Sequence, residues 1–365
     1  MATYYVGLDV HSKMSAYAIQ NEAGELIGRG EVSTTRAGLA ELRRKHELPA
    51  GTKVGLETGT VSFFVARQLQ ALELEPIVID AHEVRLKAHR PTQKSDRRDA
   101  LEICEGLRRG IYRTIVHVPP PPVAALRETL SRRRHFVRAA TSEMNAAKRL
   151  LRAAGVGVLA RSLGTDTGWE KLIASLPLGE LPLYIEQHFA QWKSAREQVV
   201  TLEKLLAQQA APFAASAALL ETIDGVGTTI ALTAIAVFSD ISRFPSAKHA
   251  ASYAGIVPST HQSGNHDAHG RITKRGSAEL RAMLCQAAHH ASRPTHPLNP
   301  YFARVCAKRG YKQAVIAVAH RLCRIIFAML RDKVPFDIAK AGVERGHFER
   351  KAVKVYRLKP REKAA

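Results

Sequence analysis

Four carboxylates in the N-terminal part of the chain have the types and spacing of a divalent-metal site. Asp96 and Asp99 lie three residues apart in QKSDRRDALE, so on a helix both side chains face the same point. Asp9 ends the apolar run YYVGLD, and Glu57 ends the run KVGLE. A carboxylate at the end of a buried strand is costly unless a cation meets it. Hard oxygen ligands suit one or two Mg²⁺ ions, or Mn²⁺ in their place, which can hold the attacking and leaving oxygens of a phosphodiester.

Each of these acids has a plainer explanation when it is taken alone. Asp96 is explained as a helix cap beside Ser95, and Asp99 as an ordinary surface residue. The order of a strand-end Asp, a strand-end Glu and a DxxD helix favours the metal site. The cations around the helix then point away from the metal and fit a nucleic-acid backbone; they are Lys94, Arg97 and Arg98.

A second candidate for chemistry lies in the loop STHQSGNHDAHGRITKRGS. The segment from Thr222 to Lys340 has six Asp or Glu against sixteen Lys or Arg, so it lacks the acids for a metal site of its own. Ser263 is the candidate nucleophile, because Gly264 beside it permits close approach of a phosphate. Three cations can neutralise the charge that develops on phosphorus, and two histidines could move a proton: Arg271, Lys274, Arg275, His261 and His269.

The loop has a non-catalytic alternative, in which it only binds phosphate. Spacing does not exclude three competing hydroxyls, which are Ser259, Thr260 and Ser277. The roles of four nearby residues stay open; these are His261, His266, Asp267 and His269.

Composition indicates a folded protein with a polyanionic partner. The 365 residues have room for about two domains, and 45% hydrophobic and 24% charged residues are typical of a soluble fold. The formal net charge of +21 favours nucleic acid as the ligand. The four cysteines form no CxxC pair, and neither a signal peptide nor a run of 18 apolar residues occurs. We expect a cytoplasmic protein without a membrane partner.

The elements that position the four acids begin as three strands in a meander. Strands that alternate with helices follow, an order typical of the ribonuclease-H-like α/β fold. Three strands are expected within residues 4–34, and two more at KVGLET and EPIVID. The expected helices are 36–46, 61–73, 81–89 and 96–109.

Four prolines in VHVPPPPV then predict a domain boundary, because consecutive prolines are expected to stay out of helices and central strands. Beyond them, apolar residues recur every seven positions from Leu130 to Leu151, and a second stripe runs from Ile185 to Leu206. The two stripes predict an antiparallel helical pair, or a coiled-coil arm between protomers. The first helix carries three consecutive arginines that are either a solvated face or phosphate contacts: Arg132, Arg133 and Arg134.

The remaining sequence predicts a mainly helical C-terminal domain. IDGVGTTIALTAIAVF resembles half of a helix-hairpin-helix, in which Gly225 and Gly227 expose backbone N–H groups to a DNA phosphate or form a plain tight turn. We therefore expect a metal domain at 1–118, a helical arm at 119–215, a serine domain at 216–342 and a basic tail at 343–365.

Taken together, these motifs resemble the insertion-sequence transposases of the IS-one-hundred-ten family, whose relatives include the Piv-type DNA invertases. The resemblance rests on GLDVHS, LETGT and KSDRRDA, and on IDGVGTTIA, YAGIVPSTHQSG, GRITKRGSAELRAML and NPYFARVCAKRGYKQAVIAVAHRL. It implies a RuvC-like DEDD domain, a coiled-coil arm and a C-terminal transposase domain with a catalytic serine.

The resemblance assigns the DEDD tetrad to Asp9, Glu57, Asp96 and Asp99, and the serine of a Ser-Gly pair to Ser263. It implies a covalent 5′-phosphoserine link to DNA, with Mg²⁺ and the acids of a second protomer completing a composite site. It also implies donor and target double-stranded DNA, a structured bridge RNA, a homo-oligomer from dimer to tetramer, and a bacterial, nucleoid-associated location. Two rivals are a structure-selective nuclease of the Holliday-junction type, which uses the acids alone, and a non-catalytic nucleic-acid-binding regulator.

Overall fold

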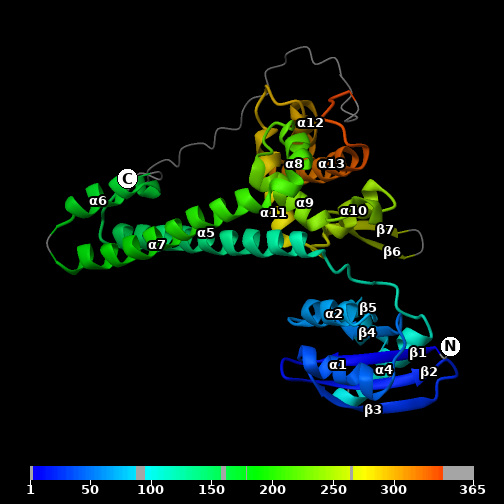
Figure 1. Ribbon diagram of the computed structural model, residues 1–365. Helices are drawn as coiled ribbons and strands as arrows, with labels where there is room; N and C mark the ends of the chain where they lie inside the picture. The colour runs from blue at the N-terminus through cyan, green and yellow to red at the C-terminus, as the bar shows by residue number, and fades with distance from the viewer. Residues whose placement is uncertain (1–2, 88–94, 158–161, 178, 264–265, 340–365) are drawn as a thin grey trace. The chain divides into compact units, whose positions relative to one another are not determined.

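The computed structural model describes the backbone of residues 3–87, 95–157, 162–177, 179–263 and 266–339 (Figure 1). Their side chains are described as well, except those of Ser162 and residues 260–269. The chain divides into two compact units, of which one ends at Pro119 and the other begins at Pro120. The prolines of VHVPPPPV therefore mark the division between the units.

The first unit is built on a five-stranded sheet in the order β3-β2-β1-β4-β5. The central strand β1 (Tyr4–Val10) pairs antiparallel with β2 (Met14–Asn21), which pairs antiparallel with β3 (Leu26–Ser33). On its other side β1 pairs parallel with β4 (Lys53–Glu57), and β4 pairs parallel with β5 (Glu75–Ile79). The predicted meander followed by alternating strands and helices is confirmed.

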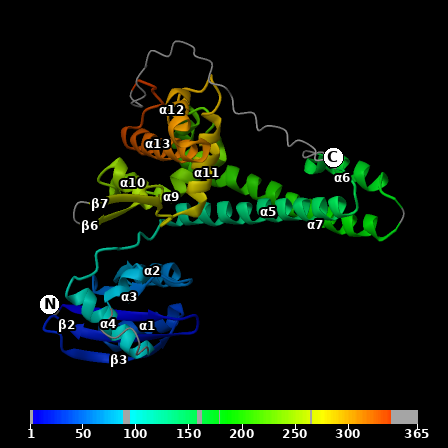
Figure 2. The ribbon, with the colours of Figure 1, turned by 180° about the vertical axis from the view of Figure 1, so that it is seen from behind.

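Helices cover both faces of this sheet. One core forms where α1 (Arg36–Lys45) and α2 (Ser62–Ala71) pack on the sheet; its fully buried members include Val6, Leu8, Leu39, Leu56 and Leu69. The short helix α3 (Ala81–Lys87) follows β5. On the opposite face α4 (Asp96–Arg108) crosses β1 and β2 (Figure 2), where Ala16 and Ala18 meet Ala100 and Cys104.

Two strand glycines let α4 lie directly on the sheet. A Cβ on Gly7 would lie 2.1 Å from the carbonyl oxygen of Ala100 and 2.4 Å from the backbone nitrogen of Cys104. On the neighbouring strand, a Cβ on Gly55 would lie 3.0 Å from the side chain of Ile103. Because strand side chains alternate between faces, the α4 face of β1 carries residues 5, 7 and 9, and that of β4 carries 53, 55 and 57.

Gly7→Ala is expected to lower the free energy of unfolding of the first unit by about 2 kcal/mol or more. The added methyl would collide with the backbone of α4 rather than with a side chain that could rotate away. Chemical denaturation measures the change. Gly59→Ala is the matched control, because a Cβ there meets nothing within 4 Å. Equal stability of the two variants would contradict the close packing of α4 on β1.

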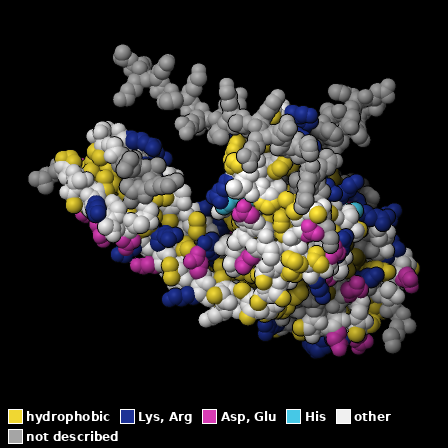
Figure 3. Space-filling model, turned by 90° about the horizontal axis from the view of Figure 1, so that it is seen from above, with side chains coloured by type: hydrophobic (Ala, Val, Ile, Leu, Met, Phe, Trp, Pro, Cys, Tyr) yellow, Lys and Arg dark blue, Asp and Glu magenta, His cyan; other side chains and the backbone are white. Residues whose placement is uncertain are grey.

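The second unit begins with an antiparallel pair of long helices, α5 (Pro121–Ala153) and α7 (Glu180–Gln209). Arg133 on α5 pairs with Glu203 on α7 at 2.6 Å, and Glu143 pairs with His188 at 2.7 Å, so the helices run in opposite directions. At the far end η1 (Ser162–Gly164) and α6 (Asp166–Ala174) close the hairpin, and Trp169 stacks on Phe189. Figure 3 shows Lys and Arg interspersed with Asp and Glu along this arm.

The expectation that the prolines stay out of helices is wrong for the last two of the four. Pro121 and Pro122 form the first turn of α5, with Pro120 as its N-cap. Backbone N–H groups have no intrahelical partner in a first turn, and the fixed φ of proline suits it.

The rest of the second unit is mainly helical. Its core is centred on α9 (Thr228–Phe238) and α13 (Tyr311–Asp332), and α5 is tied to it by Arg127, which donates to the carbonyls of Ala236 and Val237 at 2.6 and 3.0 Å. The surrounding helices are η2 (Ala211–Phe213), α8 (Ala214–Glu221), η3 (Ile241–Arg243), α10 (Ala247–Tyr253), α11 (Ala278–His290) and α12 (Asn299–Arg309).

Helix α13 is, among the described helices, the one long and apolar enough to cross a membrane by length and composition. Its apolar face packs inside the protein, where Val318, Leu322 and Ile326 are fully buried in the core of the second unit. This burial identifies α13 as a core helix.

The segment expected as a glycine- and histidine-rich loop forms a hairpin instead. Strands β6 (Pro258–Ser263) and β7 (His266–Ile272) pair antiparallel, with two residues between them. A Gly-Asn pair between two short strands is a known hairpin signal, which the composition of this segment obscured.

Candidate metal centre

Asp9 and Glu57 lie side by side at one end of the sheet. Leu8 pairs in parallel register with Leu56, so the next residues of the two central strands are these two acids. Both follow a glycine on the face that α4 covers, by the alternation of side chains along a strand. Both side chains are half-buried. The register therefore brings the two strand-end acids to the sheet edge that faces α4.

The first turn of α4 supplies the other two acids. Ser95 is the N-cap, and its carbonyl accepts the backbone N–H groups of Arg98 and Asp99 at 2.9 Å. Asp96 is the first residue of the helix and is exposed, whereas Asp99 is half-buried. Negative charge is favoured at a helix N-terminus, which lowers the cost of holding two carboxylates together there. Asp96 is thus not the cap residue itself.

Asp96 reaches across to Asp9 through a residue that sequence reasoning missed. His11 Nε2 lies 3.3 Å from Oδ2 of Asp9 and 3.4 Å from Oδ1 of Asp96. One potential metal-binding atom from each of these three residues lies within 4.8 Å of the others. The signal was in the sequence: His11 follows Asp9 by two, so a continued strand presents both on one face.

The environment of Asp9 calls for a positive charge. Burial raises the pKa of the Asp9 carboxyl above its ordinary value, and the charges of Asp96 and Asp99 raise it further, against an opposing effect of His11. Its Oδ2 is shielded from solvent, and His11 Nε2, which faces it, lies 3.3 Å away, a long distance for a charge-assisted hydrogen bond. A divalent cation would supply the charge that this oxygen lacks. The shielded oxygen and the raised pKa of Asp9 therefore indicate that this cluster fits a metal ion.

The four predicted acids are not brought together equally. Asp9 and Asp96 share the cluster with His11, and Asp99 lies near enough for its charge to act on Asp9. Glu57 lies outside that cluster of three among the described residues. Burial, followed by nearby acids, raises the pKa of Tyr112 to about 12, and the charge of Glu57 is one of the smaller causes.

The predicted cations around α4 lie away from the cluster where they are described. Arg97 is exposed and 3.4 Å from Glu31 on β3, and Arg98 is 3.7 Å from Glu102, one turn along its own helix. Lys94 lies outside the described residues.

The candidate serine is at the tip of the hairpin. Ser263 is the last residue of β6 and stands opposite His266, the first residue of β7. The side chains of both residues are outside the described set, as are those of His261, Asp267 and His269. Near the base of the hairpin three predicted cations are exposed: Arg271, Lys274 and Arg275.

Two of the competing hydroxyls have structural positions. Ser277 is the N-cap of α11, where its Oγ accepts the backbone N–H of Leu280 at 3.1 Å. The Oγ of Ser259 faces Gly270 on β7, where a Cβ would lie only 2.4 Å from it. The cap gives the Ser277 hydroxyl a role in the local fold, and the Ser259 hydroxyl occupies the space that a side chain at position 270 would need. The side chain of Thr260 is not described.

The predicted helix-hairpin-helix glycines form the turn between α8 and α9. Gly225 has φ +82° and packs closely on His290, whereas Gly227 is the N-cap of α9 and faces open space. The turn leads into the N-terminus of α9, and its role in binding DNA remains a prediction.

The three consecutive arginines of α5 make contacts within the arm. Arg133 is mostly buried in its ion pair with Glu203, and Arg132 pairs with Glu128 at 3.3 Å on its own helix. The charge of Arg134 acts on the half-buried Glu279 of α11. Arg133 thus holds the two arm helices together, and phosphate contact by this cluster remains a prediction.

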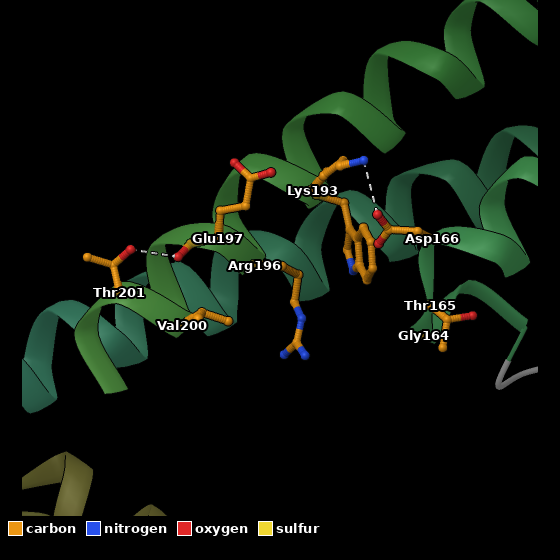
Figure 4. Close-up of a pocket in the computed structure, with 9 residues that line it drawn as sticks. Gly164, Thr165, Asp166, Lys193, Arg196, Glu197, Val200 and Thr201 are labelled. Carbon is orange, nitrogen blue, oxygen red and sulfur yellow. Dashed lines mark hydrogen bonds and ion pairs between the residues drawn. The ribbon is translucent and has the colours of Figure 1, made fainter. Parts of the chain in front are cut away.

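A separate hollow of about 580 Å³ lies beside α7 in the arm (Figure 4). Lys193 reaches Asp166 across it at 3.1 Å, and Arg196 and Glu197 also line it. Its lining carries charges of both signs, so it lacks the one-sided acidity of the Asp9 cluster.

Comparison with known proteins gives the acidic cluster a context. Residues 6–155 match a transposase model of the DEDD type, and residues 217–303 match the model of the transposase IS116/IS110/IS902 family. The sheet domain with its acidic end and the helical domain are thus each matched by a transposase model. The chain belongs to the IS116/IS110/IS902 family of transposases.

Curated relatives include both inversion and transposition proteins. The pilin gene-inverting protein of Moraxella lacunata is 38% identical over 124 residues, which are 33% of this chain and 38% of that protein. The transposase for insertion sequence element IS1111A of Coxiella burnetii is 27% identical over 67% of this chain and 69% of its own length. A probable family 20 transposase of Pseudomonas aeruginosa is 26% identical over 76% and 83%. The chain thus spans little more than a third of the length of the inverting protein. The match to a DEDD transposase domain implies that the chain uses a divalent metal.

Proposed function

We propose that the chain is a DNA recombinase that excises and inserts its own insertion sequence, with Mg²⁺ or Mn²⁺ at the acidic cluster and Ser263 as nucleophile. The observation that carries the proposal is the convergence of Asp9 and Asp96 on one point at the sheet edge, 3.3 and 3.4 Å from a shared imidazole nitrogen. The strand order β3-β2-β1-β4-β5 supports a RuvC-like, ribonuclease-H-type assignment for residues 1–118.

In the proposed reaction the serine hydroxyl attacks a phosphorus of the DNA backbone. The bond from phosphorus to the 3′ oxygen breaks, which leaves a free 3′-OH and a 5′-phosphate joined to the serine. A 3′-OH from the other DNA then attacks the phosphoserine, restores a phosphodiester and regenerates the hydroxyl. The exposed Arg271, Lys274 and Arg275 would stabilise the charge on the attacked phosphate.

A bound divalent cation supplies charge neutralisation to phosphate oxygens and an anchor for the DNA backbone. Asp9, Glu57, Asp96 and Asp99 would be the residues that hold this cation. In the sequence Lys94, Arg97 and Arg98 flank the start of α4, and they would bind the adjoining DNA backbone. The N–H groups near Gly225 and Gly227 would bind a further phosphate.

The remaining parts of the proposal concern partners and organisation. Residues 119–215 would form a coiled-coil arm, residues 216–342 the serine domain and residues 343–365 a basic tail. The chain would act as a homo-oligomer, dimer to tetramer, on donor and target DNA under guidance of a structured bridge RNA. It would do so in the bacterial cytoplasm at the nucleoid. The net charge of +21 accords with several nucleic-acid partners.

The test combines the purified full chain, labelled DNA from the ends of its element, and a transcript of the flanking non-coding region. Recombinant joints and DNA bound covalently to denatured protein are expected with Mg²⁺ and not with EDTA. Free 5′-phosphates without an adduct would favour the junction nuclease. Binding without any Mg²⁺-dependent cleavage would favour the non-catalytic regulator.

A further inference from the structure

A histidine stands inside the acidic cluster, where a DEDD site would supply only carboxylate oxygens. His11 directly follows β1, and its backbone N–H donates to the carbonyl of Met14 at 3.3 Å, which closes the turn into β2. The side chain is half exposed, so the imidazole is open to solvent while its Nε2 faces two carboxylates. The turn therefore fixes the histidine at the rim of the cluster.

The separations around this nitrogen are those of ligands on one metal ion. Neighbouring ligands of an octahedral ion with bonds of 2.0–2.1 Å lie about 3 Å from each other. Nε2 is 3.3 Å from Asp9 Oδ2 and 3.4 Å from Asp96 Oδ1. These distances are long for hydrogen bonds to a carboxylate and close to the edge of a coordination octahedron.

The oxygen that faces the histidine needs a stronger partner than the imidazole gives it. Asp9 Oδ2 is shielded from solvent, and Nε2 of His11 lies 3.3 Å from it, a long distance for a charge-assisted hydrogen bond. A metal ion between Asp9, Asp96 and His11 would satisfy this oxygen and take the lone pair of a neutral imidazole.

We propose that His11 is a metal ligand, so that the site binds its ion through one nitrogen together with the carboxylates of Asp9 and Asp96. This inference rests on the proposed metal function and deepens it. An imidazole ligand raises affinity for Mn²⁺ and Co²⁺ relative to Mg²⁺, since Mg²⁺ prefers oxygen alone. The site then discriminates among divalent ions more strongly than four carboxylates would.

A simpler role predicts the opposite sign. If His11 served only as a cation between two carboxylates, it would compete with the metal, and His11→Ala would tighten metal binding. If His11 is a ligand, the same change weakens binding. Metal affinity therefore separates the two roles without any measurement of recombination.

The experiment uses Mn²⁺ as the probe on the full chain, with His11→Ala, His11→Gln and the control His82→Ala, a histidine exposed on α3. Pulsed electron paramagnetic resonance should detect ¹⁴N coupling to bound Mn²⁺ in the native chain and in the control. Both His11 variants should lose the coupling. Calorimetry should show Co²⁺ affinity falling about tenfold or more in His11→Ala, and Mg²⁺ affinity falling less.

Two results would overturn the inference while leaving the metal centre in place. One is a ¹⁴N coupling that persists in both His11 variants, or is missing from native chain that binds Mn²⁺. The other is tighter or unchanged binding in His11→Ala. The Asp9→Asn variant tests the metal centre itself. If its affinity for Mn²⁺ equals that of the native chain, the proposed function is contradicted as well.

Discussion

Asp9→Asn is expected to reduce Mg²⁺-dependent DNA cleavage by about 100-fold or more while raising the melting temperature of the metal-free protein. In the folded chain, burial and the charges of Asp96 and Asp99 hold the pKa of Asp9 above its ordinary value of 3.8. The ionised side chain therefore opposes folding at neutral pH. Asparagine has the same shape without that charge, so it removes the cost together with the ligand.

The pH dependence of stability follows from the same shift. A carboxyl with a raised folded-state pKa binds its proton more tightly when folded, so its contribution to stability is lost as pH rises from its unfolded pKa through its folded pKa. Asp9→Asn should thus stabilise the protein at pH 7 and lose that advantage below the unfolded pKa. A divalent ion should raise the melting temperature of the native chain and not that of the variant.

Differential scanning fluorimetry, with and without Mn²⁺ across pH, measures both effects. Asp80→Asn is a matched control, because Asp80 follows β5 and its Oδ1 accepts the backbone N–H groups of His82 and Glu83. This control should keep its response to Mn²⁺. A destabilised Asp9→Asn protein that still responds to Mn²⁺ would contradict the assignment of Asp9 as a ligand.

Ser263→Ala is expected to abolish the covalent protein–DNA adduct and to reduce recombination by about 10⁴-fold or more. The hydroxyl oxygen of Ser263 is the atom that forms the bond to phosphorus, so a variant without it has no nucleophile at this position. DNA binding should stay near that of the native chain, because the cations at the base of the hairpin are unchanged. A denaturing gel with end-labelled DNA detects the adduct.

Two other serines supply the controls for this experiment. Ser259→Ala removes a hydroxyl of the same hairpin, and Ser277→Ala removes the N-cap of α11 at a cost of about 1 kcal/mol. Both variants should still form the adduct. An adduct that survives in Ser263→Ala, or disappears in Ser277→Ala at equal folded fraction, would move the nucleophile elsewhere.

The sheet and its acids could be predicted because their signals are local. Apolar runs that end in Asp9 and Glu57 gave strands with a charged end, and DxxD gave one face of a helix. That Gly7 and Gly55 allow α4 to lie on the sheet is visible only when the helix is in place. The strand period would have identified His11, since it repeats the position of Asp9 two residues later.

Tertiary partners far apart in the sequence explain what could not be predicted. The sequence alone does not pair Arg133 with an acid, because its partner Glu203 lies 70 residues away on α7. The hairpin around Ser263 was hidden by glycine and histidine, which carry little strand preference. Pro121 and Pro122 belong to a helix because they fall in its first turn, a matter of position rather than composition.

Anomalous diffraction from crystals of the full chain soaked in Mn²⁺ tests the metal centre most directly. An anomalous peak is expected about 2.2 Å from carboxylate oxygens of both Asp9 and Asp96, and absent from Asp9→Asn crystals treated alike. Manganese bound elsewhere, with these carboxylates left uncoordinated, would contradict a metal centre at Asp9 and Asp96.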